Sequence, residues 1–243
     1  MRTTEFVQTS GVKGFLAAVS KAQQRGAREA GWIAAKGERG LGKTRTLQWW
    51  AIRQNAAYLR FKADWTSRWM LEELAKELGL SADACRKQDL FTRIAMVVKA
   101  QQTIIVLDEI ELLKVRGKIK LLESLRDLSD LTETEVVIAG DEAGINHVMR
   151  YDQFASRVAA TAQFGQASQA DIRLMCDKLA EVSIADDLVA EILAQSGGYL
   201  REAKNAIAEV ERWASANSTK AVKLSDVAGR ALCAGRSRRR GAA

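Results

Sequence analysis

The sequence predicts an α/β fold in which a parallel sheet covered by helices is followed by a smaller all-helical part. Three observations predict it. Short apolar runs alternate with helical segments as far as residue 164, a pattern typical of parallel sheets with both faces covered. A glycine-rich loop directly follows the first of these runs. Beyond residue 164, only helical periodicity remains.

The first expected elements are a helix, a strand and a second helix. Residues 11–30 carry apolar side chains at helical spacing and then a charged stretch, which indicates a lead-in helix within residues 1–30. The apolar run at 32–36 predicts a strand, and the segment 46–54 after the glycine-rich loop predicts a helix. This order of strand, loop and helix opens the α/β core, which we expect to cover residues 31–165.

Further apolar runs and periodic segments complete the expected core. Each apolar run is short enough for a buried strand, and each periodic segment is long enough for a helix. The expected strands lie at 57–61, 103–109, 135–139 and 158–164, and the expected helices at 67–78, 89–100 and 116–131. A loop and a short helix are expected between the last two strands.

The rest of the chain is expected to be a helical domain of residues 166–233 and a flexible basic tail of residues 234–243. Four of the seven net positive charges belong to arginines of this tail, so the remainder is only mildly basic. The tail could hold phosphates of nucleic acid or an acidic partner, or serve only as a solubilising terminus. The expected helices of the domain are 168–181, 185–195, 199–216 and a short one near 224–232.

Composition narrows the class of protein. The 243 residues are 47% hydrophobic, which is enough for a core without disulfides or a structural metal. The three cysteines and the single histidine form no metal-binding or disulfide pattern. No apolar run approaches the roughly 18 residues of a membrane span, and the N-terminus lacks a secretory signal. We therefore expect a cytoplasmic protein with no membrane contact.

Residues 37–44, GERGLGKT, match the phosphate-binding pattern GxxxxGK[ST] without departure. Glycines let successive N–H groups face a phosphate, and the following helix directs the positive end of its dipole at the same charge. Lys43 is expected to reach the β- and γ-phosphates, and Thr44 to ligate Mg²⁺. The sequence therefore predicts an ATP site made of Gly37, Glu38, Arg39, Gly40, Leu41, Gly42, Lys43, Thr44 and Arg45.

A second motif ends the strand-like run IIVLDE in Asp108 and Glu109, about 65 residues after the loop. The aspartate can hold Mg²⁺ through water, and the adjacent glutamate can polarise the attacking water. Another strand and helix lie between the two motifs, which separates this layout from simple kinases and favours NTPases that do mechanical work or switch. We therefore expect ATP hydrolysis with Mg²⁺ as cofactor and with Lys43 and Glu109 as catalytic residues.

GERGLGKT, IIVLDEIE, the arginine of FASRV and the segment GGYLREA together resemble AAA+ ATPases. More narrowly the chain resembles the transposition-helper branch, represented by the B protein of transposable phage Mu and by related transposon and insertion-sequence ATPases. The lead-in segment EFVQTSGVKGFLAAVSKAQQRG is similar to the same branch. The resemblance implies a P-loop parallel-sheet AAA+ core followed by a small all-helical lid. The chain has no room for the N-terminal helix-turn-helix domain of the phage Mu protein, so DNA binding is expected from the core or the tail.

The resemblance also implies roles for two arginines. It gives Arg157 the role of an arginine finger on the nucleotide of a neighbouring subunit, with Arg150 as the alternative. It gives Arg201 the role of sensing the γ-phosphate in cis and closing the lid. The strand at 135–139 is followed by Gly140 and Asp141, where many AAA+ proteins have Asn, Ser or Thr to orient the water. Slow hydrolysis is therefore expected, as suits a switch.

The resemblance further implies a homo-oligomer, a head-to-tail filament or ring on double-stranded DNA. Such binding would be independent of sequence and sensitive to salt. The basic candidates, each of which could equally lie on a solvated helix face, are Arg60, Arg68, Lys114, Arg116, Lys118 and Lys120. Among the tryptophans, only Trp65 and Trp69 are candidates for stacking on bases.

We therefore expect an ATPase that assembles with ATP on double-stranded DNA and presents this target to a transposase, so that hydrolysis controls where integration occurs. The expected setting is the cytoplasm of a bacterial host, with a phage or mobile element encoding the protein. One alternative is a helicase-loader or initiator-like ATPase, which would prefer single strands and a helicase partner. Another is a signalling NTPase that recruits a protein and never touches DNA.

Overall fold

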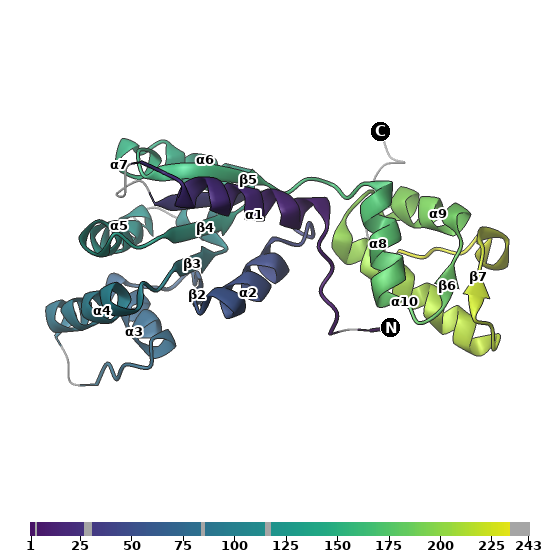
Figure 1. The fold of residues 1–243 in the computed structure, drawn as a ribbon, viewed down its shortest axis with the longest axis horizontal. Helices are drawn as coiled ribbons and strands as arrows, with labels where there is room; N and C mark the ends of the chain where they lie inside the picture. Colours follow the sequence, from purple (N-terminus) through teal and green to yellow (C-terminus); the bar gives the residue numbers. More distant parts are fainter. Residues whose placement is uncertain (3, 27–30, 84–85, 115–117, 234–243) are drawn as a thin grey trace. The chain divides into compact units, whose positions relative to one another are not determined.

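The computed structural model describes all residues except 3, 27–30, 84–85, 115–117 and 234–243. Its described residues divide into two compact units (Figure 1). One unit comprises Gly14–Glu38 and Lys43–Gln163, and we call it the sheet unit. The other comprises Met1–Lys13, Arg39–Gly42 and the described part of Phe164–Ala243, and we call it the helical unit.

A five-stranded sheet, within the described residues, forms the centre of the sheet unit. Its strand order is β2-β3-β4-β1-β5, and every pairing is parallel, as the sequence predicts. Because the strands are parallel, their carboxyl ends share one edge of the sheet. The strands are β1 (Trp32–Lys36), β2 (Ala57–Arg60), β3 (Ile105–Asp108), β4 (Val136–Gly140) and β5 (Val158–Gln163).

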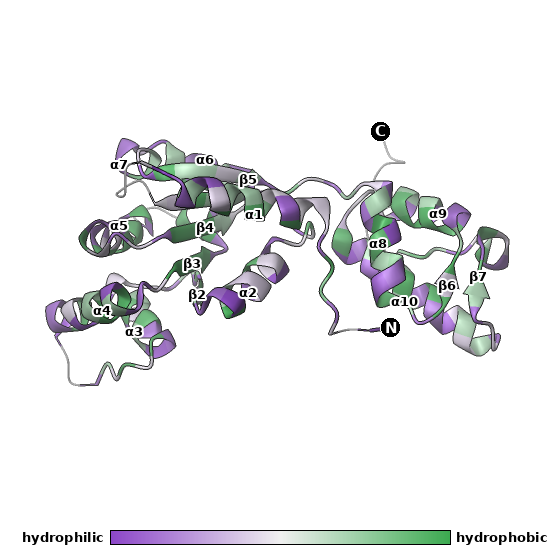
Figure 2. Cartoon of the chain, viewed as in Figure 1, coloured by the Kyte–Doolittle hydropathy of each residue, from purple (hydrophilic) through white to green (hydrophobic). Residues whose placement is uncertain are grey.

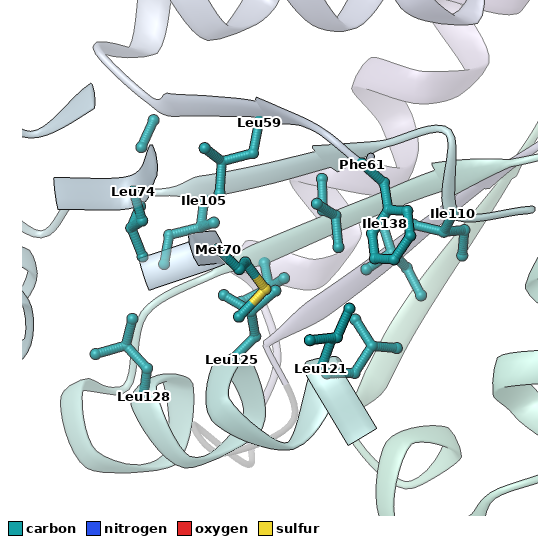
Figure 3. Close-up of a cluster of buried hydrophobic side chains, with 14 of the residues drawn as sticks. Leu59, Phe61, Met70, Leu74, Ile105, Ile110, Leu121, Leu125, Leu128 and Ile138 are labelled. Atoms are coloured by element: carbon teal, nitrogen blue, oxygen red, sulfur yellow. The ribbon is translucent and has the colours of Figure 1, made fainter. Parts of the chain in front are cut away.

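The central strands are buried on both faces. All residues of β3 and β4 are buried, which explains why these strands read as continuous apolar runs. Side chains of one face, such as Ile105 and Ile138, belong to a large cluster with leucines of the surrounding helices, among them Leu74, Leu125 and Leu128 (Figure 3). Fully burying each such side chain contributes roughly 1.5–3 kcal/mol. In Figure 2 the central strands are coloured hydrophobic, while the helices show hydrophilic outer faces.

Helices cover both faces of the sheet. The cluster takes side chains from α3, α4, α5 and α6, whereas Phe15 of α1 and Trp50 of α2 pack edge to face with each other outside it. Val106 and Val137 alternate with the clustered strand residues and therefore face the other side. The helices are α1 (Ser10–Gln23), α2 (Lys43–Gln54), α3 (Ser67–Glu77), α4 (Lys87–Gln101), α5 (Leu121–Thr132), α6 (Glu142–Met149) and α7 (Asp152–Ala155).

The predicted helix at 116–131 is wrong at its start. Helix α5 begins only at Leu121, and two short 3-10 turns, η1 (Ile110–Lys114) and η2 (Lys118–Lys120), come before it. Ile110 and Leu113 of η1 are buried three residues apart, a spacing that a 3-10 turn places on one side. The turn therefore buries both side chains against the end of the sheet.

The helical unit has its own core. Helices α8 (Gln169–Leu179), α9 (Asp186–Ser196) and α10 (Leu200–Ala216) bury a separate cluster that includes Ile172, Ile192 and Ile207. The expectation of purely helical structure after residue 165 is wrong in one respect, because β6 (Ser183–Ile184) pairs in parallel with β7 (Ala221–Val222). Two-residue strands are too short to show a period of two in the sequence.

The final predicted helix, near 224–232, is a 3-10 turn, η3 (Leu224–Val227). Its buried Val227 packs into the helical core, and one turn is enough to place it there.

Among the described residues, no helix has the length and apolar character needed to cross a membrane.

Candidate nucleotide site

The loop between β1 and α2 has the backbone that its glycines suggest. Gly40 and Gly42 have φ angles of 90° and 91°, in the left-handed region that glycine adopts without strain. Within the helical unit, a Cβ added at Gly42 would lie 2.8 Å from Cδ1 of Leu200. Both conformation and space therefore require glycine here, and the pattern match corresponds to a real structural demand.

Lys43, the first residue of α2, is bound to the loop that precedes it. Its Nζ donates to the carbonyl oxygens of Gly37 at 2.5 Å and of Glu38 at 2.9 Å, and the residue is 8% exposed. An ammonium group has three donors, so it can donate to a phosphate oxygen in addition to these carbonyls or in their place. The structure thus holds the positive charge at the loop, where a phosphate would need it.

Asp108, the last residue of β3, lies at the same sheet edge and is 1% exposed. Its Oδ1 accepts from the backbone N–H of Glu109 and its Oδ2 from the hydroxyl of Tyr58, each at 2.8 Å. No group of three acidic, histidine or cysteine side chains among the described residues could cage a metal. A single buried carboxylate such as that of Asp108 suits Mg²⁺, which proteins commonly hold through one or two carboxylates together with substrate phosphates and water. Thr44 and Asp108 are the residues that would hold it.

Glu109 adopts a φ of 63° and pairs with an arginine of the edge strand. Its Oε1 lies 2.5 Å from Nη2 of Arg60, the last residue of β2. The hydrogen bond and the charge of Glu109 raise the pKa of Arg60 above its usual value. A candidate DNA contact therefore lies against the expected catalytic glutamate.

The end of β4 explains why Gly140 departs from the AAA+ pattern. A Cβ at Gly140 would lie 2.9 Å from Cγ1 of Ile110 and 3.0 Å from Oε2 of Glu111. Turn η1 therefore leaves no room for an Asn, Ser or Thr side chain. The next residue, Asp141, caps α6 by accepting from the N–H of Gly144 at 2.6 Å. Nζ of Lys114 also donates to both carboxylate oxygens of Asp141, at 3.0 and 3.1 Å.

Arg157 lies at the amino ends of the parallel strands, whereas the loop begins at their carboxyl ends. It comes directly before β5, whereas the loop follows β1, and these two strands are parallel neighbours. Its guanidinium makes a two-pronged ion pair with Asp130 at 2.7 and 2.5 Å and donates to the carbonyl of Gln153 at 2.6 Å. Arg150, the alternative finger, is the exposed C-cap residue of α6. The role of Arg157 as the arginine finger, with Arg150 as the alternative, stays a prediction.

Arg201 lies in the first turn of α10, and its side chain is exposed. Within the helical unit, its backbone N–H donates to the carbonyl of Gly40 at 3.1 Å. Gly197 and Gly198, with φ angles of 57° and 74°, end α9 and redirect the chain into α10. The start of α10 therefore contacts the middle of the phosphate loop, and the sensing role of Arg201 stays a prediction.

Most of the basic candidates for DNA binding have partners inside the protein. Arg68 pairs with Glu72 at 2.5 Å, and Nζ of Lys118 donates to the carbonyl of Trp65 at 2.8 Å. Lys120 is exposed, and Arg116 lies outside the described residues.

The structure also separates the two tryptophan candidates. Trp65 is 1% exposed and is therefore a core residue. Trp69 is 38% exposed, with Nζ of Lys62 5.4 Å from its ring centre. Of these two candidates, only Trp69 is exposed.

Comparison with known proteins identifies the family. A family model described as AAA domain matches residues 25–149, about half of the chain, and the chain belongs to this family. The chain is 27% identical over 138 residues to the ATP-dependent target DNA activator B of Escherichia phage D108. That match covers 54% of this chain and 43% of the relative, so the chain spans less than half of the relative's length.

Solved structures share the fold. Orc1 of Aeropyrum pernix, solved in complex with DNA, matches with a TM-score of 0.63 and 16% identity over 89% of this chain and 62% of that one. Cdc6p of Pyrobaculum aerophilum matches at 0.60 and 15% identity over 89% and 64% of the two chains. Domain III of the replication initiation protein DnaA of Thermotoga maritima matches at 0.59 and 18% identity over 91% of both. The predicted AAA+ fold and the resemblance to AAA+ ATPases are confirmed.

Proposed function

We propose that this chain is a Mg²⁺-dependent ATPase that assembles on double-stranded DNA without sequence preference and delivers that target to a transposase. The observation that carries the ATPase part is the carboxyl edge of the parallel sheet, where Gly37 and Glu38 begin the loop next to Lys43, and where buried Asp108 ends β3 and Glu109 follows it. Similarity to a protein named a target DNA activator supports the DNA part. The proposed setting is the cytoplasm of a bacterial host.

Each residue at this edge has a proposed task. The loop N–H groups and Lys43 bind the β- and γ-phosphates, and Thr44 and Asp108 hold Mg²⁺, which neutralises charge that develops on the phosphates. Glu109 orients and polarises the attacking water. Arg201, at the start of α10, senses the γ-phosphate and closes the helical lid.

In the proposed assembly, Arg157 of a neighbouring copy supplies a further positive charge to the nucleotide. Arg157 precedes β5, whereas the loop follows its parallel neighbour β1, and this supports a role for Arg157 at the nucleotide of another copy. A contact between two different surfaces of identical chains repeats from copy to copy and produces a ring or a filament. ATP between two copies then strengthens their contact, and hydrolysis weakens it, so the nucleotide acts as an assembly switch.

DNA binding in such an assembly depends on basic side chains that contact phosphates. The proposed contacts are Arg60, Arg68, Lys114, Arg116, Lys118, Lys120 and the tail. Those with partners inside the protein would have to exchange them for DNA phosphates. An initiator-like ATPase is the second candidate, because the structural neighbours include Orc1, Cdc6p and DnaA.

Binding to a labelled random-sequence duplex tests the proposal. It is measured without nucleotide, with ADP and with a slowly hydrolysed ATP analogue, for the natural chain and for Lys43→Ala. We expect tight, cooperative and salt-sensitive binding only with the ATP analogue, and its loss in Lys43→Ala. Lys99→Ala, which removes an exposed lysine of α4, is the matched control and should bind normally.

The other outcomes separate the alternatives. Binding that ignores the nucleotide would contradict the switch and reduce the DNA contact to simple charge attraction. Preference for a single strand would favour the initiator-like ATPase. Failure to bind any DNA in any nucleotide state would favour an NTPase that recruits a protein.

A further inference from the structure

The hydroxyl of Tyr58 is bonded to the carboxylate that is expected to hold Mg²⁺. Tyr58 lies on the edge strand β2, opposite Val106 of β3. Its Oη donates to Oδ2 of Asp108 at 2.8 Å. Tyr58 is half-buried and Asp108 is fully buried, so this hydrogen bond is largely protected from water.

Among the described residues, each of the two carboxylate oxygens of Asp108 has one protein donor. The N–H of Glu109 donates to Oδ1 and Tyr58 donates to Oδ2, which fixes the rotation of the carboxylate about its own axis. Each oxygen keeps a lone pair with which it can accept from a water bound to a metal ion. A buried carboxylate depends on such donors, because burial without them disfavours its charged form.

An ordinary tyrosine hydroxyl, with a pKa of about 10, is a hydrogen-bond donor near neutral pH. Burial, the negative charge of Asp108 and the hydrogen bond to it raise the pKa of Tyr58 above its ordinary range. A hydrogen bond with Gln48 of α2 acts in the opposite direction and is outweighed. Helix α2, which begins with Lys43 and Thr44, packs against β2, the strand that carries Tyr58.

We propose that Tyr58 is a positioning residue that orients the Asp108 carboxylate for Mg²⁺ bound with the nucleotide, an inference that rests on the proposed ATPase function. Groups that hydrogen-bond to a metal ligand set its orientation, and their loss typically lowers metal affinity by about 10- to 100-fold. Tyr58 need not touch the nucleotide or the metal. Its effect passes through Asp108.

Replacing Tyr58 by Phe removes the donor and keeps the ring. Binding of a fluorescent ATP analogue is measured as Mg²⁺ is raised, and again in EDTA without Mg²⁺. For Tyr58→Phe we expect the half-saturating Mg²⁺ concentration to rise about 10-fold, with unchanged affinity in EDTA. Tyr151→Phe is the matched control, because Tyr151 comes before β5, at the amino ends of the strands. Its nucleotide binding should depend on Mg²⁺ as that of the natural chain does.

A double-mutant cycle tests whether Tyr58 acts through Asp108. In an Asp108→Ala background, Tyr58→Phe should cause no further change in Mg²⁺ dependence. A further loss there, an unchanged Mg²⁺ response of the single variant, or an equal loss of affinity in EDTA would each overturn the inference. If the natural chain bound nucleotide without any response to Mg²⁺, the proposed function would fail together with it, and this result is distinct from the other three.

Discussion

Two hydrogen-bond donors, Arg60 and the attacking water, compete for the carboxylate of Glu109. As the expected catalytic base it must accept a hydrogen bond from water, whereas in this structure its Oε1 accepts from Arg60. Arg60 is 64% exposed along its side chain, so the solvent screens the pair and the carboxylate can leave it at little cost. The ion pair therefore favours a resting arrangement without preventing a working one.

Removing Arg60 should release this carboxylate. For Arg60→Ala we expect ATP hydrolysis in the absence of DNA to rise a few-fold, because Glu109 spends more time free to orient water. Steady-state phosphate release measures it, and Arg68→Ala, which removes the partner of Glu72, is the control. A fall in hydrolysis would instead mean that Arg60 itself contacts a phosphate.

The sequence points to candidate nucleotide residues but does not show which side chains they contact. The loop, Lys43, Asp108 and Glu109 occur in two short segments, so a local pattern is enough to predict them as a candidate site. The pairing of Arg60 with Glu109 depends on β2 becoming the neighbour of β3, a contact between residues 49 positions apart. The steric need for Gly140 likewise depends on turn η1, which no periodicity in the sequence reveals.

At the scale of elements, the N-terminus of α8 shows how one side chain can organise a helix. Asp171 completes a capping box with Ser168 and also accepts from the N–H and the hydroxyl of Ser10, both at 2.7 Å. Burial acts to raise the pKa of Asp171, but the hydrogen bonds from Ser10 and Ser168 outweigh it and hold the pKa below its ordinary value. The carboxylate is thus stabilised in its charged form.

Stability should follow the charge of Asp171. A carboxyl group whose pKa is lower in the folded chain stabilises the fold above its unfolded pKa, about 3.9, and loses that contribution as pH falls through the folded value. Asp171→Asn should therefore lower the free energy of unfolding at pH 7 by about 1–3 kcal/mol. The difference from the natural chain should shrink near pH 3.

Urea unfolding at the two pH values, followed by circular dichroism, measures this difference. Asp177→Asn, which changes an exposed carboxylate of the same helix, should have a smaller effect at pH 7. A deficit of Asp171→Asn that is the same at both pH values would show that the charge of Asp171 contributes nothing to stability.

Elements were predictable where they are long or apolar. The five strands and the long helices follow from pattern, because burial imposes a period on ten or more residues or a continuous apolar run. The sequence does not predict turn η1 or the strands β6 and β7, because each is five residues or fewer. Tertiary contacts determine the conformation of such short segments.

At the scale of the whole molecule, the parallel sheet would give the proposed assembly a direction. Within the sheet unit, Gly37 and Glu38 follow the carboxyl end of β1, whereas Arg157 precedes the amino end of its parallel neighbour β5. Each copy can then offer its finger to one neighbour and its nucleotide to another. Arg157 must exchange its two-pronged pair with Asp130 for a phosphate when it does so.

Complementation between two inactive variants tests this direction. Arg157→Ala should bind ATP normally but lose about 10³-fold in hydrolysis, and Glu109→Gln should also bind and not hydrolyse. In a mixture, a contact between Arg157 of a Glu109→Gln copy and the intact site of an Arg157→Ala copy contains both groups. Phosphate release should therefore recover in the mixture, in proportion to such contacts.

Arg150→Ala mixed with Glu109→Gln is the matched control, because Arg150 is the other arginine of the same region. Recovery with Arg157→Ala alone identifies Arg157 as the finger that acts between copies. If Arg150→Ala is the inactive variant that recovers, the finger is Arg150. If neither mixture recovers although both variants bind ATP, the catalytic groups act within one copy, and assembly would then serve DNA binding without completing the site.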